Sequence, residues 1–206
     1  MSIATYADLK AAVADWLLRD DLTAVIPTFI SLAEADIARK LRHWRLEERV
    51  TLSVSSQYTD LPEGFVEVSM ATLAAARPVR LELISRGDMQ DRRELDAGKP
   101  DVPHYYALTG GQLEVYPTPN DTYSVDFAYI KLPSALSDSN PTNWILTYYP
   151  DIYLYGALLQ SAPYLRDDER VSLWGGLFNA AIEAATVASD KARSSGTTPR
   201  LKIRSY

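Results

Sequence analysis

Residues 105–116 read Tyr-Tyr-Ala-Leu-Thr-Gly-Gly-Gln-Leu-Glu-Val-Tyr, and this stretch decides the fold of the middle of the chain. Apolar and polar residues alternate on both sides of Gly110 and Gly111, which is the pattern of a half-buried strand. Glycine readily adopts the positive φ angles that a tight hairpin turn requires. The stretch therefore predicts a β-hairpin with the two glycines at its tip.

Segments with the same alternation lie before and after the hairpin. The period of two begins at Glu48, where Val50, Leu52 and Val54 alternate with polar residues. Further strands are predicted at 66–70, 79–83 and 123–129, and a short capped helix is predicted at 85–95. Residues 48–131 are therefore expected to form a small, mostly antiparallel β-lobe.

Before this lobe, the apolar residues follow the helical period. Thr5 with Asp8 is typical of a helix N-cap, and the first helix is expected to run to about Arg19. A second helix is expected from 26 to 42, with Pro27 suited to its first turn. Two N-terminal helices are therefore predicted.

After the lobe, helical periodicity returns at Trp144 and is expected to be interrupted at Pro163. A long helix is predicted from 167 to 193. Its predicted buried face consists of Val171, Trp174, Leu177, Phe178, Ala181, Ile182 and Ala185.

This order of elements predicts an α+β fold. The N-terminal helices (1–47) and the C-terminal helices (132–193) are expected to form one helical bundle, with the β-lobe (48–131) inserted between them. Residues 194–206 are expected to form a flexible, extended C-terminal arm, because Ser-Ser-Gly-Thr-Thr offers little apolar area to bury.

The charge of the chain is unevenly distributed. The 206 residues contain 21 bases and 27 acids, a net charge of −6, yet residues 191–206 contain five bases and no acid. The remaining acidic body is a poor general DNA binder, because neutralising phosphates supplies most non-specific affinity. The basic arm is expected to bind a protein instead, through Arg200, Leu201, Lys202, Ile203, Arg204 and Tyr206.

Residue types that build common catalytic and metal sites are scarce. The chain has no cysteine, and its two histidines are His43 and His104, so neither a thiolate nucleophile nor a three-histidine metal site is expected. No cofactor-binding motif is found. The longest uncharged stretch, 152–165, is too short for a membrane span, and the N-terminus lacks the pattern of an export signal. We therefore expect a soluble protein, made in the cytoplasm, with no cofactor, metal or membrane.

Aromatic residues are concentrated after the β-lobe. Neighbouring tyrosines point to different faces of a helix, so that one buried stripe does not accommodate them all. Tyrosine is favoured at protein interfaces, because its ring buries area and its hydroxyl tolerates water. A thick aromatic core is the alternative interpretation. The predicted subunit interface consists of Trp144, Tyr148, Tyr149, Tyr153 and Tyr155.

Several segments are informative together. They are Tyr6-Ala7-Asp8-Leu9 with Ile26-Pro27-Thr28-Phe29-Ile30, then Leu61-Pro62-Glu63-Gly64-Phe65, then 110–117, and finally 142–158 with a continuation to Trp174. In this order and spacing they resemble the head-to-tail adaptor (connector) family of tailed bacteriophages, of the type found in short-tailed phages. The resemblance covers most of the chain, and the arm after Ser194 matches only in character.

The resemblance implies a structural virion protein without catalytic activity. Members of the family form a twelve-fold ring under the portal, extend the DNA channel and offer a platform for tail or nozzle proteins. The resemblance thus implies passage of DNA without sequence-specific binding, a place at the head–tail junction after assembly in the host cytoplasm, and an arm that reaches the portal. We expect the β-lobe to face the tail, with contacts near Asp88, Arg92, Gly110 and Gly111.

Two other classes of function remain as alternatives. One is a cell-wall glycosidase that uses a carboxylate pair, Glu63 with Glu67 or Asp60. The other is a monomeric β-module that binds a peptide or a sugar, with the helices as its scaffold. The expected distinction is the oligomeric state and the presence or absence of a cleft with two facing carboxyls.

Overall fold

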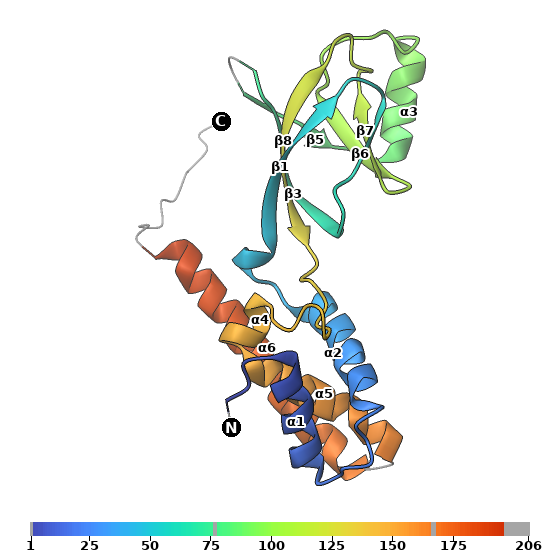
Figure 1. Cartoon of the computed structure of the whole chain (residues 1–206). Coiled ribbons are helices and arrows are strands. Elements are labelled where there is room, and N and C mark those ends of the chain that lie inside the picture. Colours follow the sequence, from blue (N-terminus) through green and yellow to red (C-terminus); the bar gives the residue numbers. More distant parts are fainter. Residues whose placement is uncertain (1, 76–77, 166–167, 196–206) are drawn as a thin grey trace. The chain divides into compact units, whose positions relative to one another are not determined.

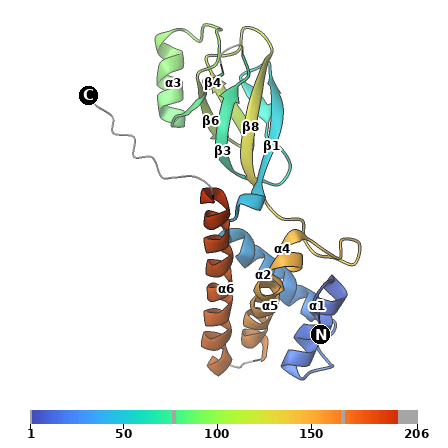
Figure 2. The same ribbon diagram turned by 90° about the vertical axis from the view of Figure 1, so that its left-hand side faces the viewer.

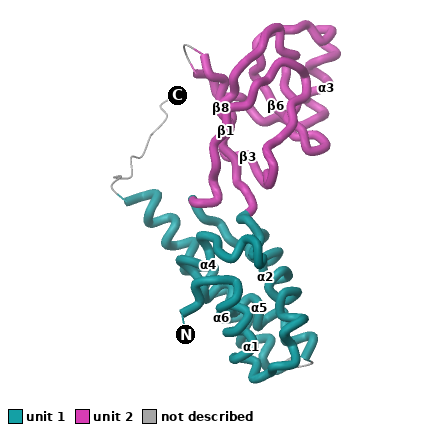
Figure 3. Tube along the Cα trace, in the orientation of Figure 1, with its two compact units in different colours: residues 1–44, 133–206 teal, residues 45–132 magenta. Residues whose placement is uncertain are grey.

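The chain folds into two compact units, seen in a computed structural model that describes residues 2–75, 78–165 and 168–195 (Figure 1). The helical unit is built from residues 1–44 and 133–206, and the β unit from residues 45–132 (Figure 3). Helices and two sheets are thus both present, which confirms the α+β class.

The helical unit is organised around one central helix, α5. Its elements are α1 (Tyr6–Leu17), α2 (Ile26–Lys40), α4 (Trp144–Tyr148), α5 (Pro150–Leu165) and α6 (Asp168–Ser194). α5 packs against α1, α2 and α6 (Figure 2). Gly156 permits this close packing, because a Cβ there would lie 3.0 Å from the Cβ of Ala33 on α2 and 3.1 Å from the ring of Phe178 on α6.

The ends of the helices follow local rules, with one exception. Thr5 and Asp8 form the expected capping box: each side chain accepts a hydrogen bond from the other residue's backbone amide. The expected interruption at Pro163 is wrong, because α5 continues to Leu165. Pro163 lies in the last turn, where its missing N–H forfeits a single bond to the carbonyl of Leu159, and the buried residues before it keep the helix packed.

The β unit contains two four-stranded sheets. Its elements are β1 (Glu47–Val54), β2 (Tyr58–Asp60), β3 (Phe65–Leu73), β4 (Val79–Arg80), β5 (Glu82–Leu83), α3 (Arg86–Leu95), β6 (Tyr105–Thr109), β7 (Gln112–Tyr116) and β8 (Tyr123–Lys131), and a short 3-10 turn (Trp44–Leu46) precedes them. The strand orders are β1-β8-β3-β4 and β2-β7-β6-β5. The pairs are antiparallel except for the parallel pair β5 and β6.

The predicted hairpin is confirmed as β6 and β7. Thr109 pairs with Gln112 at the closing end, and the glycines between them have φ angles of 58° and 82°. Both positions lie in the left-handed region that glycine tolerates. The turn therefore fixes the register of the two strands on either side of it.

The predicted strand at 79–83 is wrong as a single element. Val79–Arg80 pairs with β3 in the first sheet, whereas Glu82–Leu83 pairs with β6 in the second. Leu81 lies between the two segments and is buried in the core. The chain therefore crosses from one sheet to the other at Leu81.

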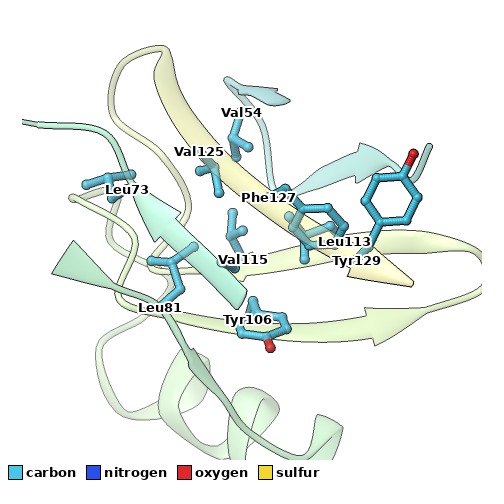
Figure 4. Close-up of a cluster of buried hydrophobic side chains, with 10 residues drawn as sticks. Val54, Leu73, Leu81, Tyr106, Leu113, Val115, Val125, Phe127 and Tyr129 are labelled. Atoms are coloured by element: carbon cyan, nitrogen blue, oxygen red, sulfur yellow. The ribbon is translucent and has the colours of Figure 1, made fainter. Parts of the chain in front are cut away.

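The core of the β unit lies between side chains of both sheets. Figure 4 shows them pointing toward one another from β1, β3, β6, β7 and β8. The cluster consists of Val54, Ala71, Leu73, Leu81, Tyr106, Leu113, Val115, Val125, Phe127 and Tyr129. Because this apolar cluster is separate from the helical unit, the β unit has a core of its own.

The first and last strands of the β unit are direct neighbours. β1 and β8 pair antiparallel without a register shift, from Glu47 opposite Ile130 to Val54 opposite Tyr123. The chain therefore enters and leaves the β unit at the same end of one strand pair.

Candidate interaction surfaces

The aromatic residues predicted as a subunit interface fall into three environments. Tyr148 is 58% exposed at the end of α4. Trp144 and Tyr149 are half-buried and surround His43, with ring centroids 4.8 Å and 5.7 Å from the imidazole. Trp44 stacks on the same imidazole at 5.9 Å. These rings pack around His43 within one chain, whereas the adjacent Tyr148 is exposed.

Tyr153 lies in the core of the helical unit, where it is 1% exposed. Its hydroxyl accepts a hydrogen bond from Asn143 Nδ2 at 2.7 Å and donates one to Glu34 Oε1 at 3.3 Å. Burial raises the pKa of Tyr153 well above its usual value, because the ionised phenolate would lose its hydration. The sequence prediction placed Tyr153 at a subunit interface; this burial removes it from the surface available to a partner.

Tyr155 belongs to a third cluster, formed with one residue from α1 and one from α6. Its ring stacks on Trp174 at 6.4 Å and meets the edge of Trp16 at 6.1 Å. Trp16 also contacts Trp174 at 5.8 Å. Since three helices contribute to this trio, its first role is to join them.

An apolar surface that sequence reasoning missed lies on α6. Leu177 was predicted to be buried but is exposed, together with Leu173 and Val187. The smaller residues between them, Gly176, Ala180 and Ala184, are also exposed. Of the helices described, α6 alone is long and apolar enough, by length and composition, to cross a membrane, a test that core helices of soluble proteins also pass. The sequence did carry a signal for this exposed surface, because both faces of the helix are apolar.

In the β unit, the residues predicted to contact the tail lie around α3 and the hairpin. Asp88 is exposed, and its backbone amide donates to Ser85 Oγ in the N-cap of α3. The guanidinium of Arg92 lies 4.3 Å from the ring centroid of Tyr105. The two hairpin glycines are exposed. These residues remain accessible to a partner.

Sequence reasoning missed an ion pair that fixes α3 to the sheet. Arg93 Nη2 lies 3.3 Å from Glu114 Oε1, and both side chains are almost fully buried. Arg93 also donates to the carbonyl of Val115 at 2.8 Å, while Glu114 accepts from Gln57 and Thr109. The signal was an acid, Glu114, between the apolar Leu113 and Val115 of β7, together with an arginine-rich helix at 86–95.

The carboxylates of the alternative glycosidase, Asp60, Glu63 and Glu67, do not line the pocket found on the β unit. A shallow pocket of about 230 Å³ on the first sheet is lined by Arg49, Val50, Thr51 and Asp126, and thus by none of the acids at 60, 63 and 67. Among the described residues, no cluster of three or more acids, histidines or cysteines is placed to hold a metal ion. The predicted portal-binding residues, 200–204 and 206, lie outside the described residues.

Comparison with known proteins adds one finding. A family model described as SU10 adaptor protein matches residues 4–200, which is almost the whole chain. No curated protein matches the chain significantly.

Proposed function

The chain belongs to the SU10 adaptor protein family and is a structural phage adaptor protein; from this premise we propose that it forms a ring that joins the portal to the tail and extends the DNA channel. The family match over residues 4–200 is the observation that carries the proposal, because it spans both units. The proposed ring is dodecameric, and its place is the head–tail junction of the virion after assembly in the host cytoplasm.

The helical unit supplies the contacts between subunits in this proposal. Its surface carries the exposed Tyr148 and the half-buried rings around His43. Aromatic residues of this kind are enriched at the core of protein interfaces. Trp144, Tyr149 and Tyr155 remain in the proposed contact set at its margin, whereas the buried Tyr153 does not.

The β unit faces the tail or nozzle proteins in this proposal. It has its own core and therefore holds its loops rigidly without needing the ring. Recognition residues are commonly found on loops that a rigid scaffold positions. The proposed contacts are Asp88, Arg92, Gly110 and Gly111, around α3 and the β6–β7 turn.

The C-terminal arm docks on the portal in this proposal. Leu201 and Ile203 alternate with Arg200, Lys202 and Arg204, so that an extended segment would present apolar residues on one face and cations on the other. Such a segment can add to a sheet edge or lie in a groove of the partner. DNA passes through the ring without sequence-specific contacts in this proposal. The body of the chain is acidic, and its negative charge disfavours binding of the DNA phosphates.

Truncation tests the proposal. A chain that ends at Arg193 is mixed with the portal protein of the same phage, and complex formation is followed by size-exclusion chromatography with light scattering. Full-length chain is expected to add a ring of copies to the portal, and the truncated chain to bind more weakly while remaining folded by circular dichroism. Unchanged binding of the truncated chain would refute the portal role of the arm, and no binding of the full-length chain would refute the adaptor role itself.

A further inference from the structure

β3 has an unpaired edge over residues 65–70, which we call the β3 edge. On one side, β3 pairs with β8 from its first residue to its last. On the other side, β4 pairs only with Thr72 and Leu73. Within the described part of the chain, no strand pairs with the β3 edge on that side. The backbone amides and carbonyls that point to that side are therefore open to pairing with another chain.

The edge is open because the next segment of the chain leaves β3 for the second sheet. Leu81 still bonds to β3, since its amide donates to the carbonyl of Ala71 at 2.9 Å. Three residues later, the amide of Ile84 donates instead to the carbonyl of Tyr106 on β6, at 3.0 Å. β3 therefore loses its neighbour just beyond the crossing at Leu81.

The β3 edge lacks two of the usual protections of an exposed strand. Natural edge strands commonly carry lysine or proline against unwanted pairing, and residues 65–70 contain neither. Val66 and Met70 are each 41% exposed. Two bulges bend the strand, which disfavours pairing of the edge with a second copy of itself.

The two faces of the chain at this edge differ in chemistry. Val68 packs against the core of the β unit. Leu83 follows the buried Leu81 at the strand period and so lies on the same face, but it is 59% exposed. Glu67 and Glu82 directly precede Val68 and Leu83, and both are exposed on the opposite face. The core side is thus apolar, and the outer side carries two acids.

The surroundings of the edge are acidic as well. Residues 50–75 contain three acids and no base. Lys131 on β8 is paired with Glu48 at 3.1 Å. Arg80 lies beyond the edge, on β4, opposite Thr72. The field at the β3 edge therefore favours cations in an incoming segment.

We infer that the β3 edge binds an extended segment of the tail or nozzle protein by strand addition, and that this segment alternates basic and apolar residues. Main-chain hydrogen bonds to an open edge supply affinity, and alternate side chains supply specificity. The apolar side chains of the segment would lie beside Val68 and Leu83, and its cations beside Glu67 and Glu82. The inference rests on the proposed tail-facing role of the β unit and names the edge and the chemistry of the partner.

A synthetic peptide of sequence Arg-Val-Lys-Val-Arg-Val-Lys tests the recognition directly. Its binding to the full-length chain is followed by fluorescence anisotropy, and amide hydrogen exchange locates the site by mass spectrometry. The peptide is expected to bind and to slow exchange at residues 65–70. The control peptide Arg-Arg-Lys-Lys-Val-Val-Val has the same composition without the alternation and is expected to bind more weakly. Equal binding of the two peptides, or protection elsewhere, would overturn the inference.

N-methylation of the peptide tests the strand pairing. A strand at an edge pairs on one side only, so its alternate amides are not equivalent. Methylating the amides of the basic residues, or those of the valines, is expected to abolish binding in one case and to spare it in the other. Equal effects of the two patterns would overturn strand addition.

Charge reversal tests the acids. Glu67→Lys with Glu82→Lys is expected to weaken binding of the alternating peptide about tenfold. Asp91→Lys with Glu94→Lys is the matched control, because it changes the net charge equally at exposed positions of α3. Equal weakening by both pairs would show a general attraction of charge and overturn the edge as the site.

Two further results decide the occupant. If the peptide binds a chain that ends at Arg193 but not the full-length chain, the chain's own arm occupies the edge, which would overturn the assignment to the tail. Rings of the Glu67→Lys, Glu82→Lys chain on the portal are expected to lose capture of the tail or nozzle protein, and rings of the control pair to keep it. Normal capture by the edge variant would overturn the inference and leave the adaptor role intact. Failure of the unmodified chain to capture that protein would instead refute the tail-facing role itself.

Discussion

The hydroxyl of Tyr153 donates a hydrogen bond to the carboxylate of Glu34 across 3.3 Å and so joins α5 to α2. The same carboxylate accepts a bond from the backbone amide of Leu136 at 2.7 Å, and the hydroxyl accepts one from Asn143 at 2.7 Å. Leu136 and Asn143 both lie in the segment between β8 and α4. One partly buried polar cluster therefore holds the segment that returns from the β unit against the helices.

Removing the hydroxyl is expected to destabilise the helical unit. Tyr153→Phe removes one of the two acceptors of the Asn143 amide, which keeps its bond to the carbonyl of Ser134, and leaves Glu34 with one donor fewer. This should lower the free energy of unfolding by about 1–3 kcal/mol. Urea denaturation followed by circular dichroism measures the change. Tyr148→Phe is the matched control at an exposed position and is expected to stay within about 0.5 kcal/mol of the parent. Equal stability of both variants would show that the cluster contributes nothing.

The same cluster predicts a specific dependence of stability on pH. Burial raises the pKa of Glu34, against the opposing effect of the hydrogen bonds from Leu136 and Tyr153. Between the usual glutamate pKa and the raised value, the folded chain binds more protons than the unfolded chain. The contribution of Glu34 to the free energy of unfolding therefore falls as pH rises through this window and stays low above it.

Glu34→Gln isolates this contribution, because glutamine keeps the acceptor oxygen but does not ionise. The free energy of unfolding of Glu34→Gln, minus that of the parent, is expected to increase from about pH 4 to pH 7. Urea titrations of both chains at several pH values measure the difference. A difference that is constant, or that decreases over this range, would contradict the raised pKa.

The buried ion pair of the β unit predicts non-additive mutations. Arg93→Met or Glu114→Gln alone leaves the partner charge buried without its counterion, and we expect a loss of about 3–5 kcal/mol for each. The double variant should lose less than the sum, because neither charge is then stranded. Arg49→Met is the control, since Arg49 lies 3.9 Å from Asp126 at the surface and should contribute under about 1 kcal/mol. If the stability losses of the two single variants add up to that of the double variant, the two charges do not stabilise each other.

Two glycine substitutions within helices are expected to have opposite signs. At Gly156 the new Cβ would lie 3.0 Å from Ala33 and 3.1 Å from Phe178, so Gly156→Ala should force the helices apart and cost about 1–3 kcal/mol. At Gly176 the new Cβ meets no atom within 4 Å, so Gly176→Ala should stabilise α6 by about 0.5–1 kcal/mol. Thermal unfolding of both variants measures the two effects. A loss of stability in Gly176→Ala would contradict the prediction and show that the backbone at this position requires glycine.

Local signals in the sequence predicted most of the elements. The capping box at Thr5 and Asp8, the cap at Ser85 and the turn at Gly110–Gly111 each depend on residues within a few positions of one another. Such interactions are formed by the local chain and are therefore readable without knowledge of the tertiary fold.

The errors arose where tertiary contacts decide. Bulges in β3 shift its register against β8, so that Val66 and Met70 are exposed although they continue the alternation. Tyr153 was assigned to an interface because the sequence does not reveal that Glu34 and Asn143 provide partners for its hydroxyl in the core. α6 is apolar on both sides, and its periodicity alone does not state which side faces α5.

The pairing of the first and last strands of the β unit has a consequence for how such adaptors diversify. Glu47 lies opposite Ile130, so the two points at which the chain crosses into the β unit are neighbours, and residues 45–132 form one uninterrupted stretch of the gene. A recombination event with one breakpoint on each side of this stretch replaces the whole β unit, α3 included, and leaves every helix of the helical unit intact. A phage can thereby acquire a different β unit as a single genetic cassette.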